Sequence, residues 1–163
     1  MITLHSLYTL IQMNNGVFDK VEAKKRRTTP QEARKVMAEV IRKKRTIKKA
    51  IYREDLGFVD FVWGYVGDKK IRPDGSRKGE KGVAHILEAR QRKDNKTEAE
   101  AAEIAMQVAE MLVTIDLNIF KPEKVEDKMI ISNGKLKAVL VKNKNDKNRW
   151  LLTGYEVWNK KTT

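Results

Sequence analysis

Apolar residues recur at helical spacing after residue 29. Thr29 and Glu32 have the spacing of a capping box, and Pro30 suits a first helical turn, so a helix begins here. We expect it to run from Pro30 to about Arg53, with an apolar stripe formed by Ala33, Val36, Met37, Val40 and Ile41. Cations fill much of its remaining surface: Arg42, Lys43, Lys44, Arg45, Lys48 and Lys49. A solvated helix face and a phosphate-tracking arm explain this charge run equally well.

Other stretches also have a helical pattern. Residues 1–20 carry a short apolar stripe, and residues 83–93 follow a loop rich in glycine and cations. Thr97 and Glu100 form a second capping box. The stripe that follows predicts the main core helix, with Ala101, Ile104, Ala105, Val108, Met111, Leu112 and Ile115 buried.

The remaining apolar runs are typical of strands. Residues 57–67 are rich in β-branched and aromatic side chains, and three later runs lie at about 127–132, 135–143 and 149–158. An Asn133-Gly134 turn separates two of these later runs, so we expect them to form an antiparallel meander. The pattern predicts an α+β fold, with amino-terminal helices packed on one face of an antiparallel, roughly four-stranded sheet. We expect a basic helical region at residues 1–54 and one α+β domain at residues 55–163.

Composition narrows the classes of partner. The 163 residues carry a net charge of +13, and a surface this positive attracts polyanions through counterion release, so nucleic acid is the expected partner. The absence of cysteine excludes disulfides and thiolate sites, and no apolar run has the length of a membrane span. The apolar start lacks the basic region of a signal peptide, so we interpret it as structure and expect action in the cytoplasm.

Two histidines are the natural acid–base candidates. His5 lies in the apolar amino-terminal stripe, where a structural role is commoner, whereas His85 follows the loop at 68–82 with its glycines and lysines. No second histidine at ligand spacing, no cysteine and no carboxylate cluster supports a metal site, and we expect no cofactor. The chain also lacks a nucleophile-elbow motif and a P-loop, so acid–base and electrostatic chemistry remain.

The last strand supplies further polar candidates. Strict alternation would place Arg149 and Thr153 on one face, roughly 13 Å apart at about 3.3 Å per residue, so both could line one groove without touching one oxygen. For Trp150 on the other face, burial in the core is commoner than base stacking.

Two strings of the sequence resemble a known grouping of nucleases. KGEKGVAHILEAR, followed by a helix, a hairpin and RWLLTGYE, is similar to the phage-associated barnase, EndoU, colicin and RelE-like nucleases over residues 56–158. The resemblance implies an α+β fold and a metal-independent ribonuclease, often a toxin encoded by a mobile element. It places the motif histidine on His85, the preceding basic position on Lys81, and the late arginine, tryptophan and hydroxyl on Arg149, Trp150 and Thr153.

These residues suggest one mechanism. A ribose 2′-OH would attack the adjacent phosphorus and leave a 2′,3′-cyclic phosphate, with His85 as general base or acid. Lys81 and Arg149 would stabilise the developing charge, Thr153 would bond a nonbridging oxygen, and Glu88 would orient the imidazole or act as second acid–base group unless it simply faces solvent. The expected RNA-binding residues are Arg77, Lys78, Arg90, Trp150 and Tyr155.

Partners follow from this activity. The expected substrate is RNA, with tRNA as one candidate, and an active ribonuclease requires an immunity or antitoxin protein, low intrinsic activity, or delivery into a target cell. The alternative is a nucleic-acid-binding module without catalysis, which the net charge supports equally.

Overall fold

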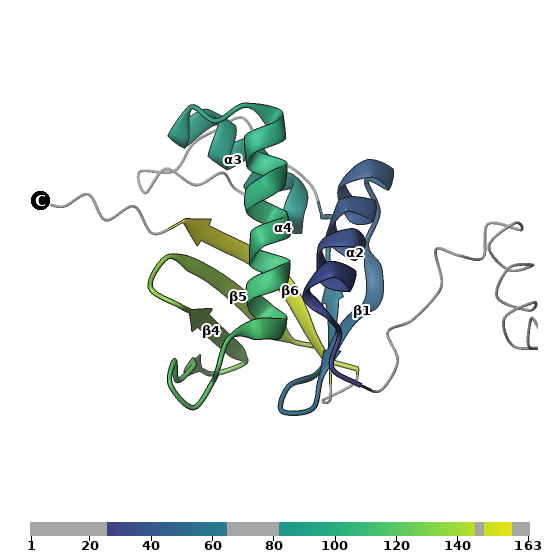
Figure 1. The fold of residues 1–163 in the computed structure, drawn as a ribbon, viewed down its shortest axis with the longest axis vertical. Coiled ribbons are helices and arrows are strands. Elements are labelled where there is room, and N and C mark those ends of the chain that lie inside the picture. Colours follow the sequence, from purple (N-terminus) through teal and green to yellow (C-terminus); the bar gives the residue numbers. More distant parts are fainter. Residues whose placement is uncertain (1–25, 65–81, 146–148, 158–163) are drawn as a thin grey trace, which may run out of the picture.

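The protein combines helices with one mixed sheet (Figure 1). The computed structural model describes residues 26–64, 82–145 and 149–157, the last three by their backbone only. Within these ranges the helices are α2 (Pro30–Lys43), α3 (Gly82–Asp94) and α4 (Glu98–Thr114). The strands are β1 (Ile47–Arg53), β2 (Gly57–Phe61), β3 (Glu123–Val125), β4 (Lys128–Ser132), β5 (Leu136–Lys142) and β6 (Arg149–Val157).

The sheet differs from the predicted one in size and pairing. Its six strands follow the order β1-β2-β6-β5-β4-β3, and β6 pairs antiparallel with β5 but parallel with β2. The α+β class and the meander β4-β5-β6 are confirmed, whereas a four-stranded antiparallel sheet is wrong. The parallel pair arises because β6 inserts between β2 and β5, a long-range pairing that local sequence patterns do not encode.

The helix predicted from Pro30 to about Arg53 ends ten residues early, at Lys43. Lys44 adopts the left-handed conformation (φ 53°, ψ 47°) and its N–H donates to the Val40 carbonyl, which closes the helix. The chain then turns back as β1 and pairs with β2. Helical spacing ends at Ile41, and the isoleucines and tyrosine that follow are β-formers, so the prediction extended the helix into a strand.

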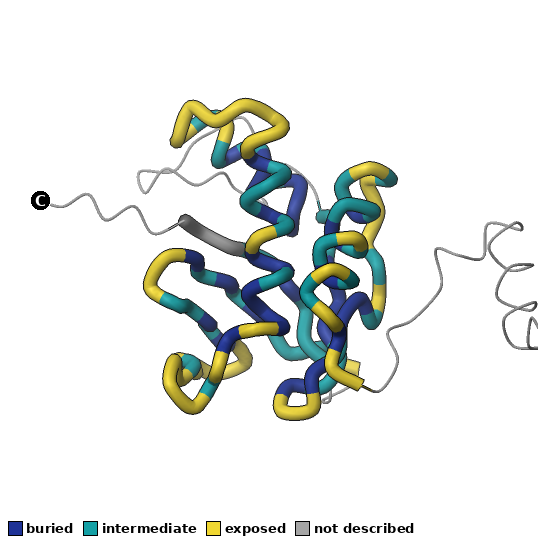
Figure 2. The backbone as a smooth tube through the Cα atoms, in the orientation of Figure 1, coloured by how far each residue is buried: buried dark blue, intermediate teal, exposed yellow. Residues whose placement is uncertain are grey.

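Apolar faces of the helices and the sheet meet in one core (Figure 2). Helix α4 packs across β1, β5 and β6, α2 packs on α4 and β1, and α3 packs on α4 and β6. Both predicted capping boxes are present, and the predicted stripe of α4 is buried apart from the half-buried Ile104. Helices α2 and α4 lie over the sheet, whereas α3 extends past its end, so the expected single helical layer is only approximate (Figure 1).

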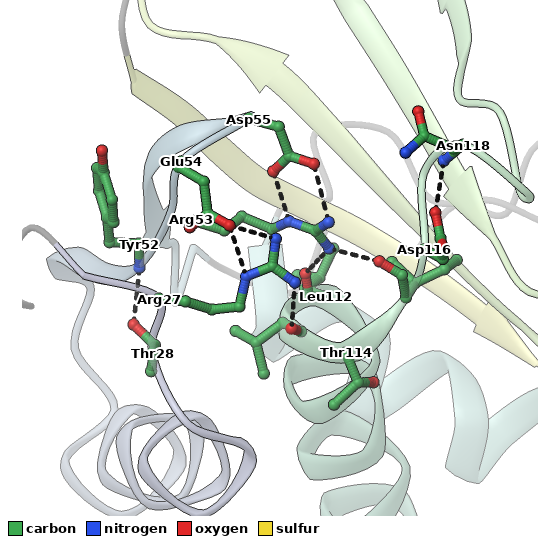
Figure 3. Close-up of polar contacts among 12 residues, drawn as sticks. Arg27, Thr28, Tyr52, Arg53, Glu54, Asp55, Leu112, Thr114, Asp116 and Asn118 are labelled. Atoms are coloured by element: carbon green, nitrogen blue, oxygen red, sulfur yellow. Dashed lines mark hydrogen bonds and ion pairs between the residues drawn. The ribbon is translucent and has the colours of Figure 1, made fainter.

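A buried arginine joins the β1–β2 hairpin to α4 (Figure 3). Arg53 is 2% exposed, pairs with Asp55, and donates to the carbonyls of Leu112 and Ile115 at 2.9 Å each. These carbonyls lie at the end of α4, where backbone acceptors lack helical partners. Arg53 therefore fixes the hairpin against the helix end.

Several predictions concern residues outside the described ranges. The amino-terminal helix at 1–20 and the loop at 68–81 belong here, as do the positions of Arg77, Lys78 and Lys81. The domain boundary after residue 54 falls in the β1–β2 hairpin, and α2 and β1 share the core with the later elements. No helix among the described residues combines the length and the apolar composition required to cross a bilayer.

Candidate active site

Helix α3 begins beside the end of β2 in space, although the two elements are separated in sequence. The N–H groups of Val83 and Ala84 donate to the carbonyls of Val62 and Trp63, each at 2.8 Å. Gly82 has a φ of +75°, and a β-carbon there would lie 2.6 Å from both carbonyl oxygens. Only glycine tolerates this conformation and this close approach, so the joint between strand and helix explains the glycine at position 82.

His85 occupies the first turn of α3 and is half-buried. The residue before it is tied to the end of β2, so the backbone of His85 is held firmly relative to the sheet. Helix α3 packs against β6, the strand that carries Arg149 and Thr153. The histidine is thus positioned by two elements that are distant in sequence.

The acidic and basic residues farther along α3 form ion pairs within the helix. Glu88 accepts a hydrogen bond from Arg92 at 2.8 Å. Arg90 pairs with Asp94 at 2.9 Å, and its side chain is only 11% exposed. Glu88 was predicted to serve the imidazole and Arg90 to bind RNA, and the structure gives both a structural partner as well.

Thr153 lies at an irregularity in β6. Leu152 pairs with Leu140 and Gly154 pairs with Val139, so Thr153 is an additional residue in the β5–β6 ladder. Its hydroxyl donates to the Val139 carbonyl at 3.4 Å. Such bulges often redirect side chains beside active sites. This bulge interrupts the alternation of side chains along β6, so the strict alternation predicted for residues 149–158 is wrong beyond Leu152.

Arg149 forms an ion pair with a buried carboxylate. Its Nη2 and Nε donate to the two oxygens of Asp60 at 2.6 and 3.3 Å, with the side chains 16% and 3% exposed. Asp60 also accepts the backbone N–H of Lys49 at 2.7 Å, where three residues of β1 lie opposite one residue of β2. The carboxylate therefore holds the bulge of β1 and the first residue of β6 together.

The register of β2 and β6 shows which site residues lie side by side across the sheet. Phe61 pairs with Leu152, so the end of β2, where α3 begins, lies beside Thr153. Arg149 pairs with Phe58. It precedes Thr153 by four residues, which is roughly 13 Å along β6. The structure therefore brings Thr153 to the level where the His85 helix begins and places Arg149 farther down the sheet.

The aromatic candidates of β6 differ in surroundings. Trp150 is half-buried against the core, and the Lys142 ammonium lies 5.2 Å from the centre of its ring, within cation–π range. Tyr155 has a backbone position opposite Ala138, and its side chain lies outside the described part.

Asp60 was missed by sequence reasoning, although the sequence contains a signal for it. The string FVDFV places one acid inside an apolar strand, and a buried carboxylate is costly unless a cation or several donors compensate it. An aspartate in such a run indicates a nearby cation in the folded chain. In the folded protein this cation is Arg149, the first residue of β6.

Across the described ranges, no three histidine or acidic side chains gather closely enough to hold a metal ion. The fold has the α+β class that the sequence predicted. The family model described as phage-Barnase-EndoU-ColicinE5/D-RelE like nuclease1 (PBECR1) matches residues 50–161. This match covers more than half of the chain, so the chain belongs to this nuclease family, which confirms the resemblance seen in the sequence. Searches of curated proteins and of solved structures find no significant match.

Proposed function

We propose that this nuclease cuts RNA without a metal ion, by attack of a ribose 2′-OH on the adjacent phosphorus. The products would be a 2′,3′-cyclic phosphate and a 5′-OH end. The observation that carries this proposal is the placement of His85, half-buried in the first turn of a helix anchored at the end of β2 and level with the Thr153 bulge.

His85 is the proposed proton-transfer group. An imidazole titrates near neutral pH, with an ordinary pKa of about 6.5, so it can remove a proton from the 2′-OH or protonate the leaving oxygen. The rigid joint between β2 and α3 supports this role, because general acid–base catalysis depends on a fixed distance to the reacting oxygen.

The other residues have supporting roles in the proposal. The Thr153 hydroxyl would exchange its long bond with Val139 for a nonbridging phosphate oxygen, and Lys81 would stabilise the negative charge of the transition state. Glu88 already accepts a hydrogen bond from Arg92, so we assign it to positioning rather than to proton transfer.

Arg149, on β6, would contribute positive charge for binding the RNA backbone. Asp60 binds its Nε and Nη2, and the Nη1 group is not part of that pair. Because Arg149 lies about four residues along β6 from Thr153, we propose that it contacts a neighbouring phosphate rather than the scissile one. Arg77, Lys78, Arg90, Trp150 and Tyr155 complete the proposed RNA-binding set.

The proposed setting is the cytoplasm of the producing cell or of a target cell. Because free ribonuclease activity would damage its host, the proposal includes an immunity or antitoxin protein as a partner, with tRNA as one candidate substrate. The family supports a nucleic-acid substrate.

Substrate chemistry tests the proposal directly. An RNA oligonucleotide should be cut in excess EDTA and yield 2′,3′-cyclic phosphate ends, detectable by mass spectrometry. The same oligonucleotide with a single 2′-deoxy sugar at the cleaved position should resist cutting there and remain sensitive elsewhere. Equal cutting at the deoxy position, or activity only with added metal, would overturn the mechanism, and binding without cutting of any RNA would favour the non-catalytic module.

A further inference from the structure

The connection between α2 and β1 carries a concentration of positive charge. Residues 42–49, called here the basic turn, contain six cations and no acid. Four of them are exposed: Arg42, Lys44, Arg45 and Lys48. The basic turn lies before the segment that the family model matches, so the family does not account for it.

Some cations of the basic turn take part in local ion pairs. Arg42 and Lys43 pair with Glu39 at 2.8 and 3.4 Å and lie in the last helical turn, where cations offset the helix dipole. Lys44 and Arg45 lie beyond the helix end, and Lys48 lies on the edge strand β1. Lys44, Arg45 and Lys48 are all exposed within five residues of each other, so their charge is accessible to an anionic ligand.

Hydrogen bonds connect the basic turn to the end of the sheet where α3 begins. The Thr46 hydroxyl accepts the N–H of Trp63 at 2.9 Å, and the Trp63 carbonyl accepts the N–H of Ala84 at 2.8 Å. His85 is the next residue along α3. The basic turn and the proposed catalytic histidine therefore lie at the same end of the molecule.

We propose that the basic turn is a second phosphate-binding surface, which holds the backbone of single-stranded RNA beyond the scissile phosphate. This inference rests on RNA being the substrate, as proposed above. Exposed lysine and arginine side chains gain affinity by releasing counterions from phosphates, without reading base sequence. The surface would thus raise affinity for longer RNA regardless of its sequence.

The test compares two charge-reversal variants in an inactive His85→Ala background. The first is Lys44→Glu/Arg45→Glu/Lys48→Glu. Its matched control is Lys121→Glu/Lys124→Glu/Lys128→Glu, three exposed lysines at the opposite edge of the sheet, so both variants change the net charge equally. Binding of a fluorescent oligouridine is measured by anisotropy in EDTA at several salt concentrations, and circular dichroism verifies folding.

The basic-turn variant should bind at least ~10-fold more weakly, and the slope of log K against log salt should fall by about 2, as expected for three lost contacts to a single strand. The control should change affinity by less than ~3-fold. Equal losses in both variants would reduce the effect to net charge, and an unchanged affinity of the basic-turn variant would end the proposal.

A glutamine triple variant at the same positions covers the case in which charge reversal disturbs folding, and it should show a smaller loss in the same direction. Because the measurement is binding alone, a protein that never cuts RNA but binds through the basic turn would refute the catalytic proposal and leave this one standing.

Discussion

At the scale of single residues, buried charges determine how elements are joined. Arg53 satisfies two carbonyls at the end of α4 while paired with Asp55 (Figure 3). Arg27, close by, forms an exposed pair with Glu54 at 2.6 Å and donates to the Val113 carbonyl at 3.5 Å. The two arginines therefore make the same kind of contact in different surroundings, and burial decides their contributions to stability.

Replacing Arg53 should be costly for this reason. Arg53→Met leaves buried carbonyls without donors and should lower the free energy of unfolding by about 3 kcal/mol. Arg27→Met should lower it by less than about 1 kcal/mol, because its partner remains solvated. Urea denaturation at neutral pH measures both, and similar losses for the two variants would contradict this assignment.

Asp60 shows what sequence reveals at the residue scale. An acid within FVDFV indicates a cation nearby, but its partner Arg149 is 89 residues away, and only the folded sheet identifies it. Likewise, strict alternation predicted that Thr153 shares a face with Arg149, whereas the bulge at Thr153 depends on the register with β5. The residue types were predictable, and their partners were not.

At the scale of elements, helix starts were predictable because their signals are local. Thr29 and Thr97 each cap a helix with a glutamate three residues later, as the spacing predicted. The end of α2 was not predictable, since residues 44–53 carry charges compatible with a helix, and pairing with β2 decides their conformation. The parallel pairing of β2 and β6 and the short edge strand β3 depend on contacts of the same long-range kind.

The α2 cap should make stability sensitive to acid. Hydrogen bonds from Arg26, and then from the backbone N–H of Thr29, hold the pKa of Glu32 at about 2 rather than 4.5. As the pH falls, the unfolded chain therefore takes up a proton at Glu32 before the folded protein does. The contribution of Glu32 to stability is complete above about pH 4.5 and is lost as the pH falls towards 2.

A glutamine variant isolates this effect. Glu32→Gln should be less stable than the parent at pH 7, by less than about 1 kcal/mol because the pair is exposed, and the difference should shrink as the pH approaches 2. Thermal melts across this pH range measure it. A difference that stays constant from pH 7 to pH 2 would contradict the assignment.

At the scale of the whole molecule, packing between helices places one group of cations near the proposed site. Helix α2 lies before the family match, yet it packs on α4, and Arg34 pairs with Glu103 and Glu110 across that contact. The basic turn at its end is thereby held beside the start of α3. Composition predicted attraction to nucleic acid, whereas this placement required the complete sheet.

The proposed function depends on proton transfer by His85 during RNA cleavage. The most direct measurement is the initial rate of RNA cutting in excess EDTA by the parent and by His85→Ala, with Gln91→Ala, an exposed change on the same helix, as control. We expect a loss of about 10²- to 10⁴-fold for His85→Ala, unchanged RNA binding, and a rate near the parent's for Gln91→Ala. Cleavage by His85→Ala at the parent rate would contradict it.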